Sequence, residues 1–78
     1  MSKVLLPELG EGITKATIAL WHHKVGDYVQ KDEDIVELVT DKAVFNVTAE
    51  ASGVIKEILF NEGQEAPIGA ALAIIETQ

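Results

Sequence analysis

Short apolar runs rich in β-branched residues recur along this chain, and glycine-rich or charged segments separate them. Such runs are typical of β-strands. The Ala-rich run 70–73 is compatible with a helix, but Gly69 and the β-branched pair Ile74-Ile75 favour a strand there. The pattern predicts a very short strand after Gly26 and longer strands at 3–7, 16–23, 35–39, 43–47, 54–60 and 72–76.

The strand at 16–23 does not alternate regularly. Ile18 and Trp21 are an odd number of residues apart, so strict alternation would place them on opposite faces. Either a bulge shifts the phase or both faces of the strand are covered, and the sequence leaves both open. Trp21 is expected in the core, because one large aromatic side chain supplies much of the apolar burial of a small domain.

The two halves of the chain repeat one pattern. A shift of 63 − 26 = 37 residues places Gly26 on Gly63. The same shift places Ile18 on Ile55, Trp21 on Ile58, Ile35 on Leu72 and Thr40 on Thr77. Two such halves can close face to face around one core, so we expect one all-β domain over residues 1–78. The turn at 40–42 and the chain ends should then lie at opposite ends of it.

Lys42 stands at the centre of the pattern. Only Thr40, Asp41 and Lys42 separate the runs 35–39 and 43–47, which predicts a tight hairpin with Lys42 at its exposed tip. Asp41 suits a turn because its carboxylate accepts bonds from nearby backbone N–H groups, but Lys42 has no such advantage. A lysine where glycine would be easier points to a function, although exposed lysines are more often only solvated charge.

Charge and composition narrow the classes of function that the chain can have. Acidic residues outnumber basic ones 13 to 6, which disfavours nucleic acid as a partner. No apolar run approaches the roughly 18 residues that cross a bilayer, and Met1-Ser2-Lys3 leads into a strand rather than a signal peptide, so no membrane association is expected. The absence of cysteine excludes disulfides and fits a reducing compartment.

Two candidate sites carry little weight. The glycines of the loop 8–13 could suggest phosphate binding, but no helix follows them and Glu8 and Glu11 would repel a phosphate. His22 and His23 are adjacent in a predicted strand and point to opposite faces, so joint metal binding is not expected. The sequence also offers no close Ser/His/Asp set, and an isolated enzyme is not expected.

Four segments in order resemble the lipoyl domain of the dihydrolipoyl acyltransferase (E2) component of 2-oxo acid dehydrogenase complexes. They are Leu9-Gly10-Glu11-Gly12-Ile13, Trp21 with Val25-Gly26-Asp27, Thr40-Asp41-Lys42-Ala43, and Gly53. The resemblance runs nearly end to end. The sequence departs from it at Val39 and Asn46, where the family often has glutamate.

The resemblance implies a flattened barrel of two four-stranded antiparallel sheets with quasi-twofold symmetry. It also implies that Lys42 carries lipoic acid in amide linkage, which removes the charge of its ammonium. Thr40, Asp41 and Ala43 would be read by the modifying enzyme, a lipoate ligase or a lipoyl/octanoyl transferase. The loop of Glu8, Leu9, Gly10, Glu11, Gly12 and Ile13 would help a partner choose its carrier.

The implied domain is a carrier without catalytic or metal-binding residues, and a monomer when isolated. A thiamine diphosphate-dependent 2-oxo acid decarboxylase (E1) would reductively acylate the arm. The E2 catalytic domain would pass the acyl group to coenzyme A, and dihydrolipoamide dehydrogenase (E3) would reoxidise the arm. The complex would lie in the cytoplasm of a bacterium or archaeon, or in the mitochondrial matrix of a eukaryote.

Two alternatives remain. Biotinyl domains of carboxylases share the two-sheet fold and the hairpin lysine, but there the lysine usually lies between methionines, and Asp41 and Ala43 flank Lys42 here. An unmodified β interaction module is the other. The loop 9–13 favours pyruvate or branched-chain acyltransferases over the succinyl type.

Overall fold

The computed structural model describes residues 1–77, which form eight β-strands. The predicted strands are confirmed with ends that move by one or two residues. Their bounds are β1 (Ser2–Leu5), β2 (Lys15–Trp21), β3 (Tyr28–Val29), β4 (Asp34–Val39), β5 (Val44–Thr48), β6 (Gly53–Ile58), β7 (Glu65–Pro67) and β8 (Ala71–Thr77). In this described part of the chain, no helix is long and apolar enough to cross a membrane.

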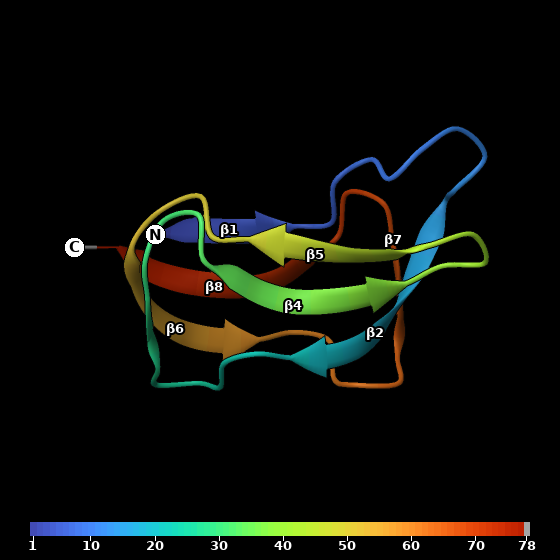
Figure 1. Cartoon of the computed structure of the whole chain (residues 1–78). Coiled ribbons are helices and arrows are strands. Elements are labelled where there is room, and N and C mark those ends of the chain that lie inside the picture. The colour runs from blue at the N-terminus through green and yellow to red at the C-terminus, as the bar shows by residue number, and fades with distance from the viewer. Residues whose placement is uncertain (78) are drawn as a thin grey trace.

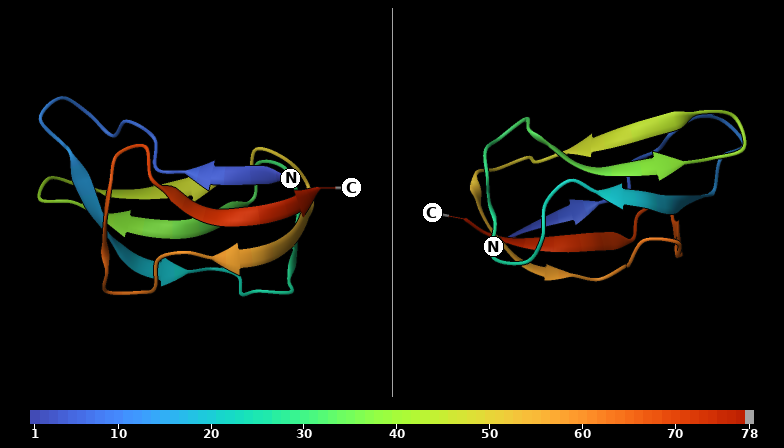
Figure 2. Two further views of the ribbon diagram at one scale, coloured as in Figure 1. Left: turned by 180° about the vertical axis from the view of Figure 1, so that it is seen from behind. Right: turned by 60° about the horizontal axis from the view of Figure 1, so that its bottom comes forward.

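The strands form two antiparallel four-stranded sheets that face each other (Figures 1 and 2). One has the order β1-β8-β6-β3 and the other the order β5-β4-β2-β7. The 37-residue shift turns β2 into β6, β3 into β7 and β4 into β8, and β5 occupies in its sheet the place that β1 has in the other. The predicted fold class and its quasi-twofold symmetry are therefore confirmed.

The symmetry extends to individual backbone bonds. The N–H of Gly26 donates to the carbonyl of Ile55 at 2.8 Å, and the N–H of Gly63 donates to the carbonyl of Ile18 at 2.7 Å. Both glycines have positive φ, 96° and 89°, which side chains disfavour. Each turn is thus tied to the long strand of the other half.

A β-bulge settles the irregular phase of β2. The pairing of β2 with β4 shifts register between Ile18 and Leu20, and the pairing of β6 with β8 shifts at the equivalent place, between Ile55 and Glu57. The bulge is therefore the correct alternative. It adds one residue to each long strand, which changes the face that the following side chains occupy.

The core lies between the sheets, and the buried side chains of residues 1–77 are all apolar. Ile18 and Ile55, equivalent in the repeat, are both fully buried. Trp21 packs against this core as expected, but its side chain is only partly buried. Its indole N–H donates to the backbone carbonyl of Phe60 at 2.8 Å. This bond satisfies the polar end of the ring at the margin of the core.

The hairpin between β4 and β5 projects from one end of the molecule, whereas β1 begins and β8 finishes at the other (Figure 1). The predicted separation of the Lys42 turn from the chain ends is confirmed. The Lys42 turn is therefore well separated from both ends of the described chain.

Candidate functional site: the Lys42 hairpin

The two strands that support Lys42 pair in register up to the tip. Leu38 pairs with Phe45 and Val39 pairs with Val44. Beyond them the N–H of Thr40 donates to the carbonyl of Ala43 at 2.9 Å, which leaves Asp41 and Lys42 as the two residues of the turn. The predicted tight hairpin is confirmed.

Thr40 organises this turn. Its hydroxyl oxygen accepts hydrogen bonds from the N–H of Lys42 at 3.3 Å and of Ala43 at 3.1 Å, and its hydroxyl lies 3.1 Å from the carbonyl of Ala43. The Asp41 carboxylate was expected to accept the backbone bonds of the turn. In the described residues, the Thr40 hydroxyl makes the side-chain hydrogen bonds of this turn instead. A threonine just before the tip was the sequence signal for this role, since hydroxyl side chains form such local turns.

The Lys42 side chain is exposed at the tip. Within residues 1–77, the ion pairs of lysine are those of Lys15 with Glu65 and of Lys56 with Glu76, and the Lys42 ammonium takes part in none. Thr40 holds the main chain at Lys42 through a hydrogen bond, whereas the Lys42 amine forms no ion pair within residues 1–77. An attached acyl group could therefore extend from a fixed base, so the residues present fit a covalently bound arm.

The loop between β1 and β2 lies at the same end as the hairpin (Figures 1 and 2). Gly12, Ile13 and Thr14 line a hollow together with Val39 to Lys42. Leu9 packs against the core, which supports anchoring as its role, while Glu8 and Glu11 are exposed. Gly10 and Gly12 have φ of 142° and 83°, and the N–H of Ile13 donates to the carbonyl of Gly10.

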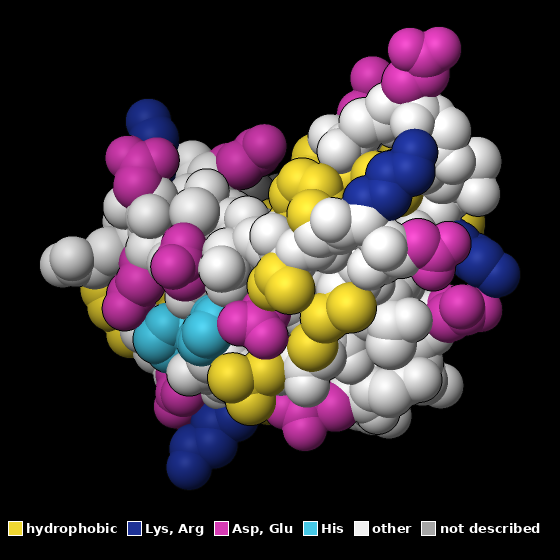
Figure 3. Space-filling view, turned by 45° about the vertical axis from the view of Figure 1, so that its right-hand side comes forward, with side chains coloured by type: hydrophobic (Ala, Val, Ile, Leu, Met, Phe, Trp, Pro, Cys, Tyr) yellow, Lys and Arg dark blue, Asp and Glu magenta, His cyan; other side chains and the backbone are white. Residues whose placement is uncertain are grey.

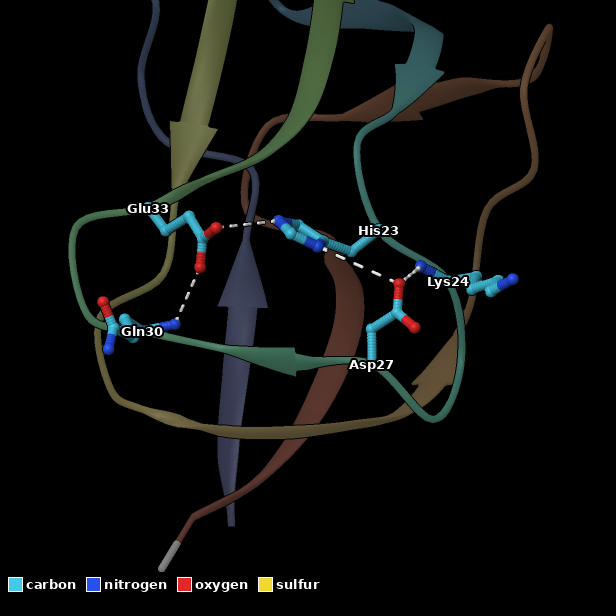
Figure 4. A network of polar contacts seen from close by, with 5 residues as sticks. All are labelled: His23, Lys24, Asp27, Gln30 and Glu33. Carbon is cyan, nitrogen blue, oxygen red and sulfur yellow. Dashed lines mark hydrogen bonds and ion pairs between the residues drawn. The ribbon is translucent and has the colours of Figure 1, made fainter.

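The two histidines have separate partners. The Nε2 atom of His22 lies 2.9 Å from the Oδ1 atom of Asn46. His23 lies between Asp27 and Glu33, with ring nitrogens 3.9 and 3.4 Å from their carboxylates (Figure 4). Each carboxylate also accepts a backbone N–H, from Lys24 and Gln30 respectively, so His23 joins the turns on either side of β3. Residues 1–77 contain no group of three or more side chains placed to hold a metal ion.

Replacing Thr40 by valine should destabilise the tip. Valine keeps the shape but loses three polar contacts, so we expect a loss of about 1 kcal/mol and faster exchange of the Lys42 and Ala43 amides. Chemical denaturation and amide hydrogen exchange measure the two effects. Thr40→Ser, which keeps the hydroxyl, is the matched control. Equal stability and exchange in the two variants would contradict the role of Thr40.

Comparison with known proteins agrees with this geometry. The family model Biotin_lipoyl, described as "Biotin-requiring enzyme", matches residues 2–75. Among solved structures, the lipoyl domain of the 2-oxoglutarate dehydrogenase complex from Azotobacter vinelandii is 43% identical, with a TM-score of 0.77 over 97% of this chain and 98% of that one.

Two curated relatives are similar over nearly the whole chain. The succinyltransferase component of the 2-oxoglutarate dehydrogenase complex from Staphylococcus saprophyticus is 49% identical over 96% of this chain. The acetyltransferase component of the pyruvate dehydrogenase complex from Mycobacterium bovis is 43% identical over 92% of it. The chain spans only 18% and 13% of these relatives.

The fold and the exposed hairpin lysine define a carrier domain for a covalently attached prosthetic group. The chain belongs to the biotin–lipoyl family, as one of the lipoyl domains found in E2 acyltransferases of 2-oxo acid dehydrogenase complexes. Lipoyl domains of this kind carry lipoic acid covalently on a lysine, and they are carriers rather than catalytic domains.

Proposed function

We propose that Lys42 is the residue that carries lipoic acid, in amide linkage to its Nζ atom. The observation that supports this most strongly is the position of Lys42 at the exposed tip of a two-residue turn with an ordered base. Each of the five other lysines lies in a strand or in another loop. Once bound, lipoic acid supplies a cyclic disulfide that takes up and hands on an acyl group.

The residues of the hairpin present this group. The bonds of Thr40 fix the backbone at Lys42, so the attachment point is rigid while the side chain beyond it is free. Amide formation removes the Lys42 charge, and the arm can then enter an apolar channel of a partner without burying an ammonium group. We propose that Thr40, Asp41 and Ala43 define the geometry that a lipoate ligase or a lipoyl/octanoyl transferase reads.

Intact-mass spectrometry tests this assignment directly. Co-expression with lipoate ligase in the presence of lipoate should add one lipoyl group to the chain and none to Lys42→Arg. Arginine keeps the charge at an exposed position, so its free energy of unfolding should change by less than about 0.5 kcal/mol. A folded Lys42→Arg variant that still gains the mass would overturn the assignment, and a gain of biotin instead would favour the biotinyl function.

The partners follow from this carrier role. We propose an E1 decarboxylase that acylates the arm, an E2 catalytic domain that transfers the acyl group to coenzyme A, and E3 that reoxidises the arm. The isolated domain is proposed to be a monomer. The relatives reported above are bacterial proteins, which favours the cytoplasm of the two compartments that the resemblance implies.

Which 2-oxo acid the parent complex oxidises is a separate question. The loop 9–13 favours a pyruvate or branched-chain complex, whereas the relatives include a succinyltransferase at 49% identity and an acetyltransferase at 43%. The preference for pyruvate or branched-chain substrates therefore stays a prediction. Reductive acylation of the lipoylated domain by each purified E1 decarboxylase assigns the substrate.

Replacing Glu8 and Glu11 by glutamine should impair acylation but not lipoylation. Both carboxylates are exposed in the loop at the lysine end, and exposed charges mainly set encounter rates between partners. We expect slower reductive acylation by the cognate decarboxylase, most visibly at low salt, where charges are least screened. Initial rates over a range of ionic strength measure this. Unchanged rates at every ionic strength would remove these glutamates from the recognition surface.

A further inference from the structure

A groove runs beside the attachment lysine, with a volume of about 230 Å³. Its floor is the outer face of the β5-β4-β2-β7 sheet, where Thr17 pairs with both Val39 and Glu65. Gly12 to Thr14 form one wall, and Thr40 to Lys42 form the other. Lys42 is thus part of the groove as well as the proposed base of the arm.

Apolar side chains lie in this groove. Val39 remains 39% exposed on its floor, and Ile13 is partly buried at its wall. Val44, the cross-strand neighbour of Val39, is 58% exposed just outside the lining. Figure 3 shows apolar side chains grouped on the side of the molecule that includes the hairpin end, with charged side chains around them.

We propose that the lipoyl arm on Lys42 folds back into this groove when no partner is bound, with its hydrocarbon chain against Val39 and Ile13. The inference rests on the proposed attachment at Lys42. It goes beyond that function, because a carrier needs only a free arm, whereas this groove gives the arm a preferred resting place on the domain.

Three features support this occupant. The arm starts at the rim of the groove, so docking is intramolecular and the effective concentration is about millimolar or higher. The hydrocarbon part of the arm and the side chains of Val39 and Ile13 are apolar, so contact between them removes hydrocarbon from water, although most of the other side chains that line the groove are polar. Amide formation also removes the positive charge of Lys42, which would oppose entry over Val39. The ion pair of Lys15 with Glu65, 3.4 Å apart and well exposed, lines the far side and bounds the apolar area.

The arm does not need to bind tightly for this to matter. A weakly docked arm spends part of its time on the domain and is released when a partner approaches the same end. Because the wall of the groove is the loop beside Glu11, a partner that contacts this loop also meets the docked arm. Val39 therefore contributes to the presentation of the arm. Its side chain does not need to touch the reacting disulfide to do so.

Nuclear magnetic resonance of the methyl-labelled domain tests the proposal. After lipoylation is verified by intact mass, the wild-type domain should show nuclear Overhauser effects between the arm and the methyl groups of Val39 and Ile13. Val39→Glu places a carboxylate on the floor, and the effects at Ile13 should be lost while the mass gain persists. Val54→Glu is the matched control, since Val54 is 36% exposed on the other sheet.

The outcomes separate the two proposals. Absence of the mass gain in the wild-type domain would refute attachment at Lys42. A full mass gain with spectral changes confined to residues 41–43, and no effect between the arm and Ile13 or Val39, would refute docking and leave attachment intact. Retention of the effects at Ile13 in Val39→Glu would show that Val39 does not form the resting place.

Discussion

Exchanging Asp41 and Lys42, as Asp41→Lys with Lys42→Asp, should abolish lipoylation while the fold remains intact. The exchange preserves composition and net charge and moves the amine by one residue at the tip. The Thr40 hydroxyl oxygen accepts the backbone N–H of residue 42 rather than that of residue 41, so a lysine at position 41 would leave the tip in another direction. A modifying enzyme that reads position should therefore find no substrate.

Intact mass after co-expression with the ligase measures this loss, and circular dichroism verifies the fold. Asp41→Ala is the control, because it removes the acidic neighbour but keeps the lysine in place, and it should still be modified. Full modification of the exchanged variant would mean that the ligase accepts any flexible exposed lysine. The geometric account of the hairpin would then be wrong.

The sequence predicted the fold well because its information is largely local and repeated. β-branched runs marked the strands, and positive-φ glycines such as Gly26 and Gly63 marked equivalent turns. The 37-residue shift supplied the relation between the halves that local patterns lack. Lys42 stands out in the sequence because a lysine in a tight turn has no conformational advantage there.

Other features depended on contacts that no pattern specifies. The hydroxyl of Thr40 and the carboxylate of Asp41 can both satisfy a turn, and only the backbone path decides that Thr40 does so. The bulge near Ile18 and the half-buried place of Trp21 depend on how β2 meets β4 and the Phe60 carbonyl. The groove at Val39 depends on the position of the loop that leads into β2.

Gly53 is a further case, and its replacement by alanine should cause a large loss of stability. Gly53, one of the residues that carry the family resemblance, begins β6, pairs with Val29 and Thr77, and is buried. A Cβ atom there would clash with the backbone carbonyl of Glu76 and lie 2.8 Å from the Cγ2 atom of Ile75. Glycine is therefore required at position 53 because the neighbouring strand leaves no space for a Cβ atom, and not because of a positive φ.

Backbone cannot yield as a surface side chain can, so we expect Gly53→Ala to cost about 2–3 kcal/mol. A domain of this size has only about 3–5 kcal/mol of net stability, so Tm should fall by roughly 10 °C or more. Gly63→Ala is the control, because its Cβ meets open space and only the φ of 89° opposes it, at a cost of about 1 kcal/mol. Thermal and urea unfolding compare the two variants. If Gly53→Ala costs no more than Gly63→Ala, β6 and β8 can separate to admit a methyl group, and close approach is not what selects glycine at position 53.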